Sequence, residues 1–193
     1  MLLRHRPPAI SSQPGTTAEL YAHLSLKSVA VLRWLQAIRV EHVLVGPVAE
    51  AIRAGRPSGD PAPAGVVAIV PAPYGRNYKR LCQGLWAEHA RLRVDGEPET
   101  VPVKLTEEKM MRGGRWTLRC GVHDLDVEGH PAGAPSYQEL LYEAARFNLS
   151  DDLAVDVASP EDVELYRQLA RTGAAPEIRI TRAASERAAA DAS

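Results

Sequence analysis

Two aspartates stand two residues apart in the segment HDLDV, at Asp124 and Asp126. In a strand, alternate side chains share a face, so these carboxylates would lie together and offer the oxygen ligands that Mg²⁺ prefers. His123 and His130 bracket the pair. Two interpretations stay open: a metal site with a histidine nearby, or a strand with solvated acids and surface histidines. The second is favoured, because His123 is expected on the opposite face of the strand.

The apolar run HVLV is closed by a turn at Gly46 and Pro47, and the segment VAEAIRAG follows. Pro47 suits the first position of a helix, because its missing N–H is not needed there. The turn therefore predicts the start of a helix directly after a buried strand.

Elements must position these residues, and the hydrophobic spacing of the chain indicates which ones. Ser159, Pro160 and Asp162 are typical of a capped helix start. The alternation predicts an α/β (α+β) fold, a mixed sheet with helices packed on it. The spacing predicts helices over 24–38, 47–55, 78–92, 136–145 and 159–171, strands at 42–45, 66–70, 116–120 and 123–127, and a hairpin over 147–157.

The composition of the chain bears on its domain organisation, its partners and its compartment. The chain has 193 residues with 45 % hydrophobic residues, enough for one core, which we assign to 19–172 between a disordered tail (1–18) and a flexible or helical tail (173–193). A net charge of -1 gives no reason to expect nucleic acid as a partner. No apolar run reaches membrane length, and two cysteines without metal-ligand spacing predict thiols in a cytoplasmic protein.

Five segments occur in an order that resembles one family over about residues 26–171. They are VLVGPVAEAIRAGRP, VVAIVPAP, WTLRCGVHDLDV, PAGAPSYQELL and VASPEDVELYRQL. The chain looks like the minimal nucleotidyltransferases of the polymerase β superfamily, which include toxin-type members of bacterial defence and toxin–antitoxin systems. The resemblance implies a glycine turn that cradles a nucleotide triphosphate, Asp-x-Asp on the next strand, and a third carboxylate on a neighbouring strand. These acids hold Mg²⁺.

The resemblance carries over to this chain only in part. Gly46 matches the turn glycine, and Asp126 matches the third acid. Arg53 and Arg56 flank the nucleotide cleft that the resemblance implies and could contact phosphate there. Pro47 stands where a second small residue is expected, and Val66 and Ala68 stand at the two aspartate positions. Neither of these apolar side chains can bind a hard cation.

Another alignment uses the segment SGD and treats the residues after it as an insertion. It recovers one acid, Asp60, but Ala62 follows two residues later. Either way the Asp-x-Asp pair is broken, and the candidate ligands of a Mg²⁺ ion are Asp60, Asp124 and Asp126. With either alignment, 43–45 and 66–70 are expected to be neighbouring strands, with 123–127 beside the second.

Three hypotheses follow for function. The first is a pseudoenzyme that keeps the nucleotidyltransferase fold as a binding or regulatory module, with a nucleotide or a protein as its partner. The second is an active metal-dependent nucleotidyltransferase that moves a nucleotide from an NTP to an RNA, protein or small-molecule hydroxyl, with Asp124 and Asp126 as catalytic acids. The third is a structural partner of an active homologue. Mg²⁺ dehydrates reluctantly and normally needs carboxylates together with substrate phosphates, so the loss of one strand's acids favours the first hypothesis.

Overall fold

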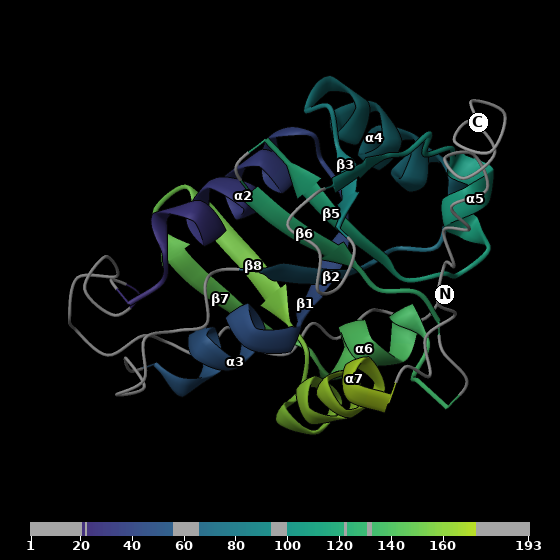
Figure 1. Cartoon of the computed structure of the whole chain (residues 1–193). Helices are drawn as coiled ribbons and strands as arrows, with labels where there is room; N and C mark the ends of the chain where they lie inside the picture. The colour runs from purple at the N-terminus through teal and green to yellow at the C-terminus, as the bar shows by residue number, and fades with distance from the viewer. Residues whose placement is uncertain are drawn as a thin grey trace, which may run out of the picture.

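The strands form one mixed sheet. The computed structural model describes residues 21, 23–55, 66–93, 100–121, 123–130 and 133–172. Within these residues, eight strands lie in the order β4-β3-β5-β6-β2-β1-β8-β7 (Figure 1). Their bounds are β1 His42–Val45, β2 Val67–Pro71, β3 Arg91–Arg93, β4 Thr100–Pro102, β5 Trp116–Cys120, β6 His123–Val127, β7 Ala145–Ser150 and β8 Leu153–Val157. The predicted α+β class is confirmed.

Helices alternate with the strands along the chain. Their bounds are α2 Leu26–Ala37, α3 Gly46–Ala54, α4 Gly75–Ala87, α5 Glu107–Met111, α6 Tyr137–Glu143 and α7 Pro160–Thr172. None of the helices within the described residues is both long and apolar enough to cross a membrane. The predicted tails and the loop at 56–65, which includes Arg56 and Asp60, lie outside the described residues.

Strand β2 occupies the centre of the sheet. It pairs antiparallel with β1 on one side and parallel with β6 on the other, and helices α2 and α3 pack against it, so all five of its residues are buried. A short β-branched run without alternation is typical of a strand covered on both faces. The expected neighbourhood of 43–45, 66–70 and 123–127 is confirmed, although β2 begins one residue later than predicted, at Val67.

Two groups of helices pack around this sheet. A Cβ atom on Gly84 of α4 would lie 2.7 Å from the Ile38 side chain and 2.9 Å from that of Trp34, so α4 packs closely on α2. Helices α3, α6 and α7 lie together near β1, away from α4 and α5 (Figure 1). Figure 1 also shows α4 beside β3. The helices around the sheet therefore form two separate groups, one with α2 and α4 and one with α3, α6 and α7.

One buried amide connects α4 to the centre of the sheet. The side chain of Asn77 is fully buried, and its Oδ1 accepts a hydrogen bond of 2.9 Å from the backbone N–H of Glu41. Its Nδ2 donates to the carbonyl oxygens of Glu41 at 2.8 Å and Ala72 at 3.1 Å. Asn77 thereby supplies the acceptor for the Glu41 N–H and adds a second donor to two carbonyls that already accept from backbone N–H groups.

The predicted helix over 78–92 differs most from the structure. Helix α4 begins at Gly75 and ends at Ala87, and residues Arg91–Arg93 form strand β3 instead. The helix ends because His89 adopts a left-handed conformation with φ 50°. The N–H of His89 then donates to the Trp86 carbonyl and that of Ala90 to the Leu85 carbonyl, the pattern of a Schellman motif. The left-handed position of this motif is usually glycine, so the histidine there gave no sequence signal for the end of the helix.

Other differences are smaller. Leu26, predicted on the apolar stripe of α2, is 88 % exposed, whereas Leu32 and Leu35 are buried as expected. The predicted strands did not include β4, and the predicted helices did not include α5. Helix α6 ends at Glu143, before the predicted limit, and β7 begins at Ala145. The predicted cap of the last helix is confirmed, since Ser159 Oγ accepts from the Asp162 N–H at 3.1 Å and donates to its carboxylate at 2.8 Å.

Candidate functional site

The hairpin of β5 and β6 places acids opposite basic residues. In its antiparallel register, Asp124 faces Arg119 and Asp126 faces Thr117. Arg115 directly precedes β5 and Glu128 directly follows β6, so the same register brings these two together. We call the six charged side chains on this face the acid–arginine ladder. Its members are Asp124, Asp126, Glu128, Arg93, Arg115 and Arg119.

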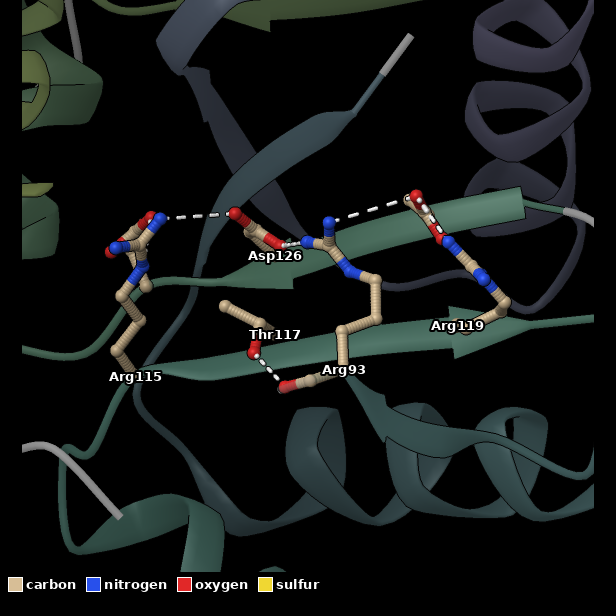
Figure 2. A network of polar contacts seen from close by, with 7 residues as sticks. Arg93, Arg115, Thr117, Arg119 and Asp126 are labelled. Atoms are coloured by element: carbon tan, nitrogen blue, oxygen red, sulfur yellow. Dashed lines mark hydrogen bonds and ion pairs between the residues drawn. The ribbon is translucent and has the colours of Figure 1, made fainter. Parts of the chain in front are cut away.

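Asp126 lies at the centre of the ladder. It is 6 % exposed, and its two carboxylate oxygens accept hydrogen bonds from different arginines, Arg93 of β3 and Arg115 at 3.0 Å (Figure 2). Thr117, its partner on β5, donates to the Arg93 carbonyl at 3.0 Å and so fixes the strand that carries Arg93. Burial raises the pKa of Asp126 more than the two arginines lower it.

Asp124 is held from two sides as well. Arg119 donates to both of its carboxylate oxygens, at 2.9 Å and 3.2 Å, and Arg93 lies 3.6 Å away. Partial burial opposes ionisation, but the Arg119 hydrogen bonds and the Arg93 charge outweigh it and lower the pKa of Asp124. This bidentate geometry is the strong form of an arginine–carboxylate contact.

Glu128 completes the ladder and has the most unusual environment. Its carboxylate lies 3.1 Å from Nε of Arg115 and is 8 % exposed. Burial is the main reason that its pKa is raised to about 7, and the nearby charge of Asp126 raises it further, while Arg115 opposes both. Within the described ladder, three acids therefore face three arginines, and the charges cancel when every acid is ionised.

Gly46 and Ala68 adjoin this ladder. Ala68 is the Cα partner of Asp126 across the parallel β2–β6 pair, and of Val45 across β1–β2. Gly46 has φ 69°, and a Cβ atom placed on it would lie 3.0 Å from the Ala68 Cβ. The start of α3, the centre of β2 and Asp126 thus meet at one place. The side chain that β2 presents there is a methyl group, 4 % exposed.

The other sequence-predicted site residues lie elsewhere. Arg53 is in the last turn of α3, at the far end from Gly46, where it donates to the carbonyls of Ala158 and Val157, the latter at 3.0 Å. Its guanidinium also lies over the Phe147 ring, 5.7 Å from the centroid. Val66 precedes β2 and is partly exposed. Arg53 is therefore a link between α3 and β8.

The histidines also separate from the acids. His123 pairs with Cys120 and shares its face, opposite to that of Asp124 and Asp126, as the alternation predicted. The N–H of His130 donates to the Gly113 carbonyl at 3.2 Å. Among the described residues, no group of three or more His, Cys, Asp or Glu side chains is arranged to hold a metal ion.

The carboxylates of the ladder are poorly suited to Mg²⁺. Such an ion needs carboxylate oxygens with free lone pairs. The oxygens of Asp126 and Asp124 are engaged by arginines, whose positive charges repel a cation, and β2 contributes Ala68 rather than a carboxylate. The described residues of this site therefore do not fit a magnesium ion.

The sequence reasoning missed the arginines. Arg93 directly follows the predicted helix 78–92, and the sequence pattern assigns no role to Arg115 or Arg119. One feature of the sequence indicates Arg115 and Arg119. If 116–120 and 123–127 form a tight hairpin, alternate residues of R-W-T-L-R (115–119) lie opposite alternate residues of D-L-D-V-E (124–128) on the same face. Comparisons with known proteins add no assignment, since neither the models of known families nor the curated proteins contain a match to the chain.

Proposed function

We propose that the chain is a catalytically inactive nucleotidyltransferase-like domain that serves as a binding or regulatory module. The observation that carries this proposal is the pairing of Asp124 and Asp126 with three arginines beside Ala68. In the enzymes that the sequence resembles, this region holds a divalent cation against a triphosphate. Here the arginines neutralise the surviving acids, and the cation has no place.

Loss of the metal ion destabilises the transition state of nucleotide transfer. A metal ion that neutralises developing charge on phosphate contributes several kcal/mol, and every 1.4 kcal/mol or so changes the rate tenfold. Pro47 also removes one backbone donor from the turn at Gly46. A hydrogen bond to a charged group is worth about 1.5–3 kcal/mol, so nucleotide binding is weakened as well.

The proposed role belongs in the cytoplasm, where the thiols of Cys82 and Cys120, both free in the structure, are stable as thiols. A protein partner or a weakly bound nucleotide is the ligand that such a module would recognise.

The test combines binding and activity. Calorimetric titration with MgCl₂ or MnCl₂, with and without ATP or CTP, is expected to give no site in the low micromolar range. No labelled nucleotide is expected to be transferred to RNA or to the protein itself. Transfer by the unmodified protein that disappears in a folded Asp126→Ala variant would overturn the proposal, and so would tight metal binding lost in the same variant.

A gain-of-function series sharpens the test. Pro47→Gly combined with Val66→Asp and Ala68→Asp is expected to introduce a nucleotide-dependent rise in melting temperature that no single substitution produces. Position 68 is 4 % exposed, so an aspartate there destabilises the sheet, and folding must first be checked by circular dichroism. Nucleotide-dependent stabilisation of the unmodified protein equal to that of the triple variant would contradict the stated cause of the loss.

A further inference from the structure

A second candidate site lies on the opposite face of the sheet. A partly open cavity of about 150 Å³ separates α2 from the ends of β5 and β6. Its apolar lining comes from Ala30, Val31, Trp34 and Leu125, and its polar lining from Glu88, Cys120 and His123. Because Cys120, His123 and Leu125 point away from the acid–arginine ladder, this cavity is separate from the site described above.

The size of the cavity limits what can enter it. An apolar cavity of about 150 Å³ accommodates one benzene-sized ring. Cys120 is 6 % exposed, and burial raises the pKa of its thiol to about 12, with the charge of Glu88 as a further cause. The thiol therefore stays protonated at neutral pH and adds to the apolar surface of the cavity.

The polar groups indicate the charge of a ligand. Glu88 is exposed at the end of α4, and its carboxylate has no ion-pair partner among the described residues. The Nδ1 atom of His123 is buried and has no hydrogen-bond partner there either. A carboxylate and a histidine nitrogen in one cavity, both unpartnered within the described residues, favour a ligand with a positive charge and N–H donors. The indole ring of Trp34 lines the same cavity and adds apolar aromatic surface.

We propose that this cavity binds a single aromatic ring that carries a basic amino group. The ring lies among Val31, Trp34 and Leu125, and the ammonium group lies toward Glu88, where the cavity meets solvent. The proposal is independent of the function proposed for the ladder, because it uses no residue of that face.

Benzylamine is the probe, and methyl NMR of the ¹³C-labelled full chain is the measurement. Benzylamine is expected to shift the methyl signals of Val31 and Leu125 with a millimolar or lower dissociation constant. Benzyl alcohol lacks the charge and butylamine lacks the ring, so each is expected to bind at least tenfold more weakly. Absence of these shifts with benzylamine would overturn the site, and equal binding of benzyl alcohol would overturn the proposed ligand class.

Three variants locate the binding. Glu88→Gln, an exposed substitution, is expected to weaken benzylamine at least tenfold, whereas the matched control Glu50→Gln on α3 leaves it unchanged. Ala30→Leu fills the cavity from α2 and is expected to abolish binding while the methyl spectrum of the sheet persists. Unchanged affinity in Glu88→Gln, or in a folded Ala30→Leu protein, would show that benzylamine binds elsewhere.

Discussion

Asp126 and Asp152 are both aspartates paired with arginine, yet their environments differ sharply. Asp126 has a side chain 9 % exposed and is held by two arginines, whereas the side chain of Asp152 is 64 % exposed and pairs with Arg33, itself 48 % exposed. Exposed pairs contribute little because water and salt screen them. Removing one member of a buried pair is far more harmful, since it leaves the partner charge without compensation.

We therefore expect Asp126→Ala to lower the free energy of unfolding by about 3 kcal/mol, because Arg93 and Arg115 lose their shared carboxylate. The matched control, Asp152→Ala, is expected to unfold at nearly the same urea concentration as the unmodified protein. Urea titrations followed by circular dichroism measure both. Equal destabilisation by the two substitutions would show that the ladder contributes no more than a surface pair.

The raised pKa of Glu128 is expected to make the free energy of unfolding fall as pH rises. Its ordinary pKa is 4.5, and burial raises the pKa to about 7 in the folded protein. Between these values the folded state binds more protons than the unfolded state, so stability falls as pH rises. The contribution is fully present below pH 4.5 and is lost as pH rises through 7. One pKa unit corresponds to about 1.4 kcal/mol, so we expect a loss of about 3 kcal/mol over this window.

The variant that isolates this effect is Glu128→Gln, which cannot ionise. Its free energy of unfolding, measured by urea titration at several pH values from 4.5 to 7.5, should depend less steeply on pH than that of the unmodified protein. Asp126 titrates in both proteins, and its raised pKa contributes a slope of the same sign to each. Identical slopes in the two proteins would exclude Glu128 as the group responsible.

Among the elements, α4 depends on one residue for its attachment. Asn77→Ala would leave the Glu41 N–H without its partner, while the Ala72 carbonyl keeps the hydrogen bond from the Tyr74 N–H. A polar group left unsatisfied costs about 1–3 kcal/mol, so we expect a loss of about 1–3 kcal/mol in the free energy of unfolding. Gln83→Ala, an exposed substitution in the same helix, serves as the control and should stay within about 0.5 kcal/mol. Thermal and urea unfolding both report this difference.

Element types were predictable where hydrophobic spacing decides them. The runs at 42–45 and 123–127 are strands with the predicted bounds, and the capped start of α7 is where Ser159 and Pro160 indicate it. Helix ends were less predictable: α2 and α4 both end in left-handed residues that are not glycine, Arg39 with φ 56° and His89 with φ 50°. Tertiary packing imposes these conformations, and local sequence does not reveal them.

For the whole molecule, the order of strands predicts where the backbone opens first. Strands β1 and β2 are paired on both sides and lie in the middle of the described sheet, whereas β4 and β7 lie at its two ends. Amide hydrogens of β1 and β2 should therefore exchange only through global unfolding, at least about a hundredfold more slowly than those of β4. Hydrogen exchange followed by NMR or mass spectrometry tests this. Faster exchange in β2 than in β4 would contradict the strand order.

The parts of the candidate site that follow from the strand order could be predicted from the sequence. Gly46, Ala68 and Asp126 meet because the segments adopt the expected strand order. The hairpin alternation indicates Arg115 and Arg119 as partners of the acids, but the contact of Arg93 with Asp126 could not be predicted. Arg93 reaches Asp126 only because α4 ends early and leaves room for β3, so an error in one helix boundary hid a member of the site.

The cancelled charges of the ladder also restrict how this chain can change over many generations. A carboxylate introduced alone at position 68 would be buried beside Asp126, and loss of Arg93 or Arg115 alone would leave Asp126 undercompensated. Each single step toward a cation-binding arrangement is therefore destabilising, although several steps taken together need not be. Single substitutions therefore hinder a change from the present ladder to a cation-binding site, because each intermediate protein is less stable than the starting one.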